Sequence, residues 1–227
     1  FLKNIDAKNI SYSQLEEIEV ISYSNLNKNN NNKKFSQFKL PSFDNILLVG
    51  SGPSALEYSE DLKNFADEKN CLLVTLNYLS PFTRQDFHLR AACNPIRFFA
   101  DKDYYLQSNE ILLLPEKLID TINENNFEKS LKIICYNIEI SSQGFEYTDK
   151  SCTLPNTLSI FYALSFLLTL KKDKIFLAGI DGYSKGDPRN EVIDDLFDQI
   201  SQKSESSLIG LTPTIHKNIR HDSVFNF

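Results

Sequence analysis

The sequence predicts an α/β fold in which helices flank a doubly wound, mostly parallel sheet. Short apolar runs of strand length recur along the chain, and segments of helical character separate them. Glycine, asparagine or proline residues follow several of these runs and mark where they end. Strands separated by helices pair in parallel through right-handed crossovers, and the 227 residues suffice for one large domain of this kind.

The expected strands are the short apolar runs. In chain order they are residues 45–49, 71–76, 87–93, 110–114, 131–135 and 174–178. The first run ends at Gly50 and the second at Asn77, and both residue types are typical of turns. The third run ends in Asn94-Pro95, and the sixth is followed by Gly179, so each of these strands delivers a loop to the same edge of the sheet.

The expected helices lie between these strands or after them. They are residues 55–69, 96–106, 116–125, 156–170 and 191–203. Pro53 precedes the first helix at a position that suits a first helical turn. The segment EVIDDLFD in the last helix carries apolar residues at helical spacing, which predicts an amphipathic helix with a solvated acidic face.

Composition excludes several classes of function. Lys and Arg number 24 against 30 Asp and Glu, a net charge of −6, so the chain has no broad basic field for nucleic acid. The cysteines are widely spaced without a C-x-x-C pair, which favours buried free thiols over disulfides or a metal site. Every apolar run is shorter than the roughly 18 residues of a membrane helix, so we expect a soluble domain.

The N-terminal region differs in composition from the rest. Residues 25–34, NLNKNNNNKK, form a polar low-complexity stretch that reads as a linker. We therefore expect a connecting segment at 1–40 and an α/β domain at 41–227, whose ligand is inferred from the loops described below. The chain begins at Phe1 and contains no Met, which suggests a fragment of a longer polypeptide. As separate expectations, we place the protein in the cytoplasm and expect that it could form oligomers.

The loop after the first strand, Gly50-Ser51-Gly52-Pro53-Ser54, is a candidate phosphate site. Backbone N–H groups at a helix N-terminus favour an anion, and glycines permit its close approach. The loop lacks both the G-x-G-x-x-G spacing and the Gly-Lys-Ser/Thr of a P-loop. The alternative interpretation is a tight strand-to-helix turn that binds nothing.

Three other loops bring polar side chains to this edge. Asn77 and Asn94 could pair with a base edge or a ribose hydroxyl, although asparagine is also a common turn former. Asp181 and Tyr183, in the segment GIDGY, follow the sixth strand. A carboxylate there can bind a ribose hydroxyl, and the alternative is an Asx turn or a helix cap.

These motifs, in this order, resemble the bacterial sialyltransferases of glycosyltransferase family 42, which use CMP-sialic acid. The resemblance covers residues 45–183: G-x-G-P-S, then Asn, then Asn-Pro with Phe-Phe, an apolar helix and Gly-Ile-Asp-x-Tyr. It implies a Rossmann-like sheet of the GT-A-variant sialyltransferase type. The domain also resembles the C-terminal part of aldolase-like proteins from surface-polysaccharide gene clusters, which implies a covalently fused aldolase-like domain.

The resemblance implies a role for each matched residue. Contacts to the ribose, base or phosphate of the nucleotide fall on Gly50, Ser51, Gly52, Asn77, Asn94, Gly179, Ile180 and Asp181. Independently of the resemblance, Ser54 or Ser51 in the glycine loop could donate a hydroxyl to the ligand. Tyr183 would contact the phosphate, together with a hydroxyl at the start of the apolar helix. Ser159 or Thr157 could supply this hydroxyl, and an ungapped count back from Tyr183 favours Ser159. The donor is the CMP-sugar, and no metal or further cofactor is implied.

The sequence departs from the family at two positions. A second phosphate-binding tyrosine is replaced by Arg189, which could still neutralise a leaving phosphate. The family's general-base histidine matches Leu211 within SLIGLTPTIHKN, and His216 lies five residues later. His216 is the expected base, and we predict that its ring lies near Tyr183 and Gly52.

Three functions follow from these residues. The leading one is transfer of a CMP-activated acidic sugar, of the sialic or ulosonic acid type, to a surface-glycan acceptor, with Tyr183, Arg189 and His216 as catalytic residues. The second is a catalytically silent module that binds a nucleotide or glycan precursor beside an aldolase. The third, pyrophosphate transfer to a hydroxymethylpterin, needs Mg²⁺-binding carboxylates that the sequence lacks.

Overall fold

The computed structural model describes residues 40–77, 79, 82, 88–107, 110–124, 131–142 and 144–226. The expected connecting segment with its Asn-rich linker, apart from Leu40, lies outside the described residues. In the loop that follows the second expected strand, residues 78, 80 and 81 also lie outside the described residues.

The main sheet has eight strands in the order β11–β10–β9–β1–β2–β3–β4–β5, and every neighbouring pair is parallel. The strands are β1 (Asn45–Val49), β2 (Cys71–Leu76), β3 (Leu89–Ala91), β4 (Ile111–Leu114), β5 (Lys132–Cys135), β9 (Lys174–Ala178), β10 (Ser207–Gly210) and β11 (Arg220–His221). The chain builds outward from β1 to β5 and then returns to β9 on the other side of β1. This confirms the predicted doubly wound, Rossmann-like α/β fold.

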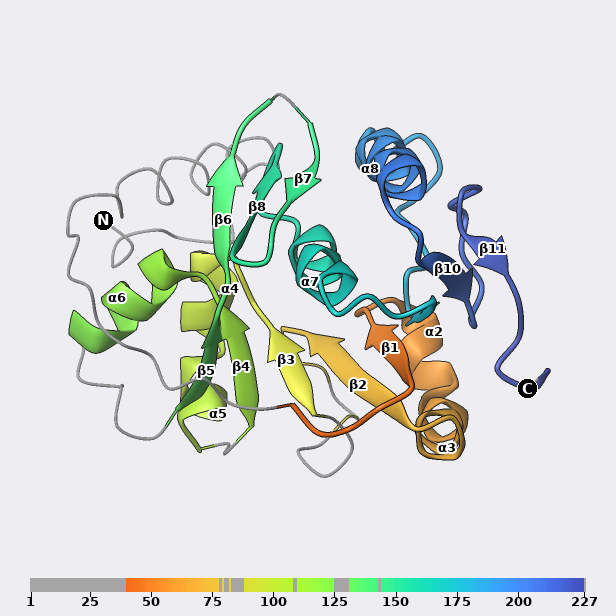
Figure 1. Ribbon diagram of the computed structural model, residues 1–227, viewed down its shortest axis with the longest axis horizontal. Coiled ribbons are helices and arrows are strands. Elements are labelled where there is room, and N and C mark those ends of the chain that lie inside the picture. The colour runs from red at the N-terminus through yellow and green to blue at the C-terminus, as the bar shows by residue number, and fades with distance from the viewer. Residues whose placement is uncertain are drawn as a thin grey trace.

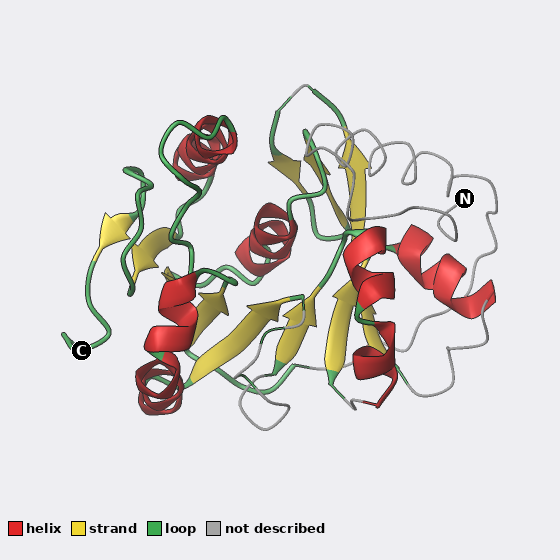
Figure 2. Cartoon of the chain, turned by 180° about the vertical axis from the view of Figure 1, so that it is seen from behind, coloured by secondary structure: helices red, strands yellow, loops and turns green. Residues whose placement is uncertain are grey.

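Helices lie on both faces of the sheet (Figures 1 and 2). They are α2 (Pro53–Glu57), α3 (Ser59–Glu68), α4 (Pro95–Ala100), α5 (Lys102–Gln107), α6 (Glu116–Glu124), α7 (Ser159–Leu168) and α8 (Arg189–Lys203). Helix α7 is buried along nearly its whole length and shares one core cluster with α8. Helix α3 packs its apolar side on the opposite face.

The central strands are apolar on both faces because both are covered. In β1, Ile46 and Leu48 belong to the core cluster under α7, whereas Leu47 and Val49 belong to the cluster under α3. All four side chains are fully buried. Continuous apolar runs are the pattern expected of parallel strands between two helical layers, which is why these strands could be located from sequence.

A second, three-stranded sheet was not predicted. It consists of β6 (Asn137–Ile140), β8 (Ser151–Leu154) and β7 (Glu146–Tyr147), in that order, with β8 parallel to β6 and antiparallel to β7. Tyr136 ties it together, because its hydroxyl donates to the carbonyls of Thr148 (3.1 Å) and Ser151 (3.0 Å). The sheet lies beside α7 and extends the cover of that face (Figure 1).

Several predicted helices have other boundaries in the structure. The helix expected at 55–69 is divided at Tyr58, and the helix expected at 96–106 begins at Pro95 and is divided at Asp101. Both dividing residues have ψ near zero, which turns the chain between the two helices. The apolar helix expected at 156–170 begins only at Ser159, because Leu158 is extended.

The third expected strand, 87–93, is shorter in the structure, where β3 covers Leu89–Ala91. Residue 87 lies outside the described part of the chain. The strand ends early because Asn94 caps α4 and Pro95 has no N–H for a ladder hydrogen bond.

Candidate functional site

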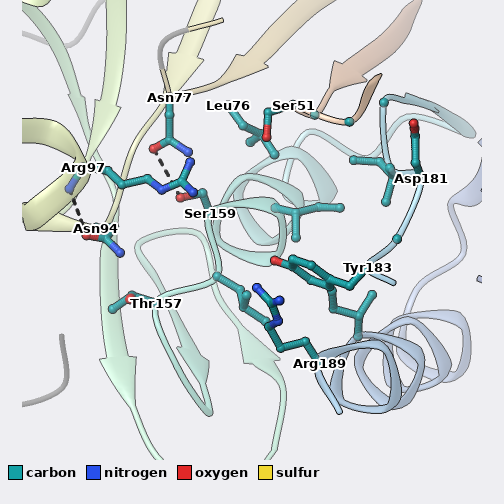
Figure 3. Close-up of a pocket in the computed structure, with 18 of the residues that line it drawn as sticks. Ser51, Leu76, Asn77, Asn94, Arg97, Thr157, Ser159, Asp181, Tyr183 and Arg189 are labelled. Carbon is teal, nitrogen blue, oxygen red and sulfur yellow. Dashed lines mark hydrogen bonds between the residues drawn. The ribbon is translucent and has the colours of Figure 1, made fainter. Parts of the chain in front are cut away.

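A cavity of about 540 Å³ opens at the carboxyl ends of β1, β2, β3 and β9, beside the N-terminus of α7. The strand order reverses between β1 and β9, and in open α/β sheets ligands bind at this switch point. Figure 3 shows Asn77, Asn94 and Arg97 on one side, Tyr183 and Arg189 on the other, and Ser159 between them. All residues that the sequence predicted to bind the ligand or to act in catalysis line this cavity except Ser54.

The glycine loop packs directly against the loop after β9. The Gly52 N–H donates to the carbonyl oxygen of Gly179 at 2.8 Å. A Cβ atom at Gly52 would lie 2.6 Å from that oxygen, and one at Gly50 would lie 2.6 Å from it as well. Glycine is therefore required at both positions for the two loops to touch, whether or not a ligand binds.

The carboxylate of Asp181 occupies the N-terminus of α2, where the sequence suggested a phosphate. It accepts a hydrogen bond from the Ser54 N–H at 2.9 Å and another from the Ser54 hydroxyl. The Ser54 Oγ also lies 2.9 Å from Thr212 Oγ1, which accepts from the Gly179 N–H. Ser54 is buried in this network and, unlike the other predicted site residues, does not line the cavity.

Asn77 is held in a left-handed conformation, with φ of 51°, at the end of β2. Its carbonyl accepts a hydrogen bond from Arg90, a fully buried side chain that also pairs with Glu110 at 2.9 Å. The Asn77 side chain is thereby aimed at the cavity, where its Oδ1 lies 3.5 Å from the Ser159 hydroxyl. The structure thus brings two predicted site residues into contact from distant segments.

Asn94 has a structural task as the N-cap of α4. Its Oδ1 accepts the N–H of Arg97 at 3.1 Å, while the residue also lines the cavity. The Arg97 side chain extends from the first turn of α4 toward Ser159 (Figure 3). Within the described residues no carboxylate pairs with its guanidinium. Sequence analysis did not select Arg97, although its position three residues after an Asn-Pro cap was a usable signal.

Both hydroxyls proposed at the start of the apolar helix are present at the cavity. Thr157 is buried and Ser159 is the first residue of α7, and both line the wall. The structure therefore leaves the sequence alternatives open, with two hydroxyl groups available at this end of the helix.

Tyr183 and Arg189 form a stacked pair on the other wall. The Arg189 guanidinium carbon lies 3.6 Å from the centre of the Tyr183 ring. The same guanidinium binds both carboxylate oxygens of Asp187, and this pairing holds the pKa of Asp187 below its usual range. Arg189 thus lies at the cavity with Asp187 as its counter-ion. Sequence analysis did not predict this ion pair.

His216 lies at the cavity and is fully buried. Its Nδ1 lies 2.6 Å from Oδ1 of Asp194, a residue of α8 that sequence analysis placed on a solvated face. Its Nε2 is buried, and none of the described residues forms a hydrogen bond with it. Leu211, which matches the family's base position, is only 3% exposed and packs in the core cluster under α3, away from the cavity.

The other histidines are elsewhere. His88 Nδ1 accepts the N–H of Leu73 at 3.1 Å, and burial lowers the pKa of His88. His221 is exposed on β11 at the edge of the sheet. Of the three, His216 alone lines the cavity between β1 and β9.

The charges at the cavity suit an anionic ligand. Arg97 and Arg189 face it from opposite walls, and the carboxylate of Asp181 is taken up by α2. Among the described residues, no group of three or more His, Cys, Asp or Glu side chains is arranged to hold a metal ion. None of the helices within the described ranges is long and apolar enough to span a bilayer.

We compared the chain with protein-family models, with curated proteins and with solved structures, and none of them matches it. The functional conclusions therefore rest on the residues of the cavity and on the motif order in the sequence.

Proposed function

We propose that this chain binds a CMP-activated acidic sugar, of the sialic or ulosonic acid type, and transfers the sugar to a hydroxyl group of a glycan acceptor. The observation that carries the proposal is the set of groups around one cavity: donors for an anion and a buried imidazole with an open nitrogen. The choice of cytidine and of an acidic sugar comes from the motif order shared with family 42.

The cavity has the size and the charge for such a donor. Its volume of about 540 Å³ falls within the range of sites for small ligands, about 300–1,000 Å³. The donor carries a phosphate and a carboxylate, and Arg97 and Arg189 offer positive charge on opposite walls. Charge-assisted hydrogen bonds to these groups are about twice as strong as neutral ones.

The reaction needs a base for the acceptor and hydrogen-bond donors for the leaving group. In the proposed step the acceptor oxygen bonds to the anomeric carbon, and the bond from that carbon to the phosphate oxygen breaks. CMP leaves with the electron pair, stabilised by the Tyr183 hydroxyl and the charge of Arg189. The hydroxyl proton passes to Nε2 of His216, with which no described side chain or backbone group forms a hydrogen bond.

Titration calorimetry with CMP, UMP, GMP and AMP tests the donor. We expect CMP to bind and the other nucleotides to bind at least about tenfold more weakly, a difference of roughly 1.4 kcal/mol. Tyr183→Phe, which removes one hydroxyl, should weaken CMP and leave cytidine unchanged. No heat with millimolar CMP, from a protein that still unfolds cooperatively, would refute the assignment.

Turnover separates transfer from silent binding. CMP release from a CMP-activated acidic sugar is measured with and without a panel of glycan acceptors. Acceptor-dependent release is expected, because His216 lies at the cavity. Tight CMP binding without any release from the donors tested would instead support the catalytically silent module.

A further inference from the structure

The carboxylate of Asp194 and the imidazole of His216 are joined by a hydrogen bond between Oδ1 and Nδ1, 2.6 Å apart. We infer that Asp194 is a positioning residue: it fixes the proton of His216 on Nδ1 and so keeps Nε2 as the proton acceptor of a residue that lines the cavity. This inference deepens the proposed function and rests on it, because it names the residue that makes the base competent.

The hydrogen-bonding chemistry determines the tautomer. The Nδ1 to Oδ1 distance is 2.6 Å, and an ionised carboxylate can only accept a hydrogen bond. Nδ1 must therefore carry the proton. In a neutral imidazole the other nitrogen then holds a lone pair, which is the state that a general base needs.

The open nitrogen is unusual for a buried group. Leaving a buried polar atom without a partner costs about 1–3 kcal/mol, and most such atoms in proteins are paired. His216 is 0% exposed, its Nε2 has no hydrogen-bond partner within the described part of the chain, and the residue lines the cavity. An acceptor hydroxyl in the cavity would supply the missing donor.

The ring of His216 is fixed from several sides. Phe197, one turn after Asp194 on α8, packs against it with ring centres 5.6 Å apart. The backbone N–H of His216 donates to Thr214 Oγ1 at 3.2 Å. The backbone N–H of Ile215 donates to the carbonyl oxygen of Asp181 at 3.2 Å. The loop that carries His216 is thus hydrogen-bonded to the loop after β9. With the ring held in place, Asp194 determines which ring nitrogen carries the proton.

Nitrogen NMR tests the tautomer directly and without any substrate. The chain has only three histidines, so long-range ¹H–¹⁵N spectra resolve them, and His216→Gln assigns the signal. We expect His216 of the wild-type protein to be protonated on Nδ1 at neutral pH. In Asp194→Asn the amide can either accept or donate, so a mixture of tautomers is expected.

Asp195→Asn is the matched control, because Asp195 is the exposed neighbour of Asp194 on the same helix. It makes the same chemical change and should leave the His216 signals unchanged. Thermal unfolding of each variant verifies the fold. A wild-type His216 protonated on Nε2, or a tautomer unaffected by Asp194→Asn, would overturn the inference.

Kinetics with a CMP-activated acidic sugar and an acceptor give the second measurement. Asp194→Asn should lower kcat by about 10²–10⁴ with little change in KM, since it impairs a base and not binding. His216→Gln should give a similar loss, and the double variant should lose no more than the single ones. If kcat is unchanged in Asp194→Asn, Asp194 does not position the base.

The two hypotheses fail separately. If no CMP-sugar binds or reacts, the proposed function falls, while the tautomer measured in the free protein still decides the role of Asp194. If the donor reacts but the tautomer does not depend on Asp194, the function stands and this inference falls.

Discussion

Arg97 reaches into the cavity from the first turn of α4, and no carboxylate in the described part of the chain neutralises it (Figure 3). Replacing it by Ala should therefore weaken CMP far more than cytidine. A charge-assisted hydrogen bond contributes about 1.5–3 kcal/mol, so we expect about a ten- to a hundredfold loss for CMP by calorimetry.

Lys174→Ala is the control for net charge, because Lys174 is exposed at the first residue of β9, away from the carboxyl ends of the strands. It removes one positive charge far from the cavity and should leave both affinities unchanged. Equal losses for CMP and cytidine in Arg97→Ala would show that Arg97 does not bind the phosphate.

Single residues also show what sequence reasoning could and could not reach. Asn94, Asp181 and Tyr183 were selected because they follow strands, and all three lie at the cavity. That Asp181 binds Ser54, and that Asp194 binds His216, depends on side chains brought together from separate segments. Such contacts leave no pattern in the local sequence. The sequence therefore could not show whether Asp181 caps a helix or binds a ligand.

At the scale of elements, the two loops at the switch point fit only because of their glycines. A Cβ at Gly52 would lie 2.6 Å from both the Gly179 oxygen and Oδ1 of Asp181. Gly52→Ala must therefore push the loops apart, and we expect a loss of about 1–3 kcal/mol in unfolding free energy.

Denaturant unfolding followed by circular dichroism measures this loss. Ser51→Ala, at the exposed neighbouring position, should stay within about 0.5 kcal/mol of wild type. If Gly52→Ala were as stable as wild type, the close packing of these loops would not contribute to stability.

The elements that were predicted well have long, uniform patterns. Strands β1, β2 and β9 are buried on both faces and read as continuous apolar runs. The breaks at Tyr58 and Asp101 are invisible to periodicity, because one residue with ψ near zero is enough to turn the chain. The strands of the small sheet are as short as β4 and β5 but contain polar residues such as Glu139 and Thr153, so they lack the continuous apolar run that identified those two strands.

At the scale of the whole molecule, the core determines the reactivity of the thiols. All four cysteines are free. Burial raises the pKa of Cys71 and Cys152 to about 12 and that of Cys135 to about 11, and Cys93 is fully buried. Since the thiolate is the reactive species, a disulfide reagent at pH 8 should react slowly with the native protein.

After unfolding in denaturant, four equivalents of thiol should react at once. With an aromatic disulfide as the reagent, the absorbance of the aromatic thiol that it releases gives the reaction rates of the native and the unfolded protein. Rapid reaction of Cys71, Cys93 or Cys152 in the native protein would contradict the burial of that residue.

The position of β1 at the centre of the sheet affects how the protein folds. One edge of β1 pairs with β2, the next strand in sequence, whereas the other pairs with β9, which follows most of the chain. During synthesis on a ribosome, the backbone N–H and C=O groups on one edge of β1 cannot pair with β9 until β9 has been made. Contacts between such distant segments slow folding, and unpaired edges promote aggregation, so chaperones have a long interval in which to act on this chain.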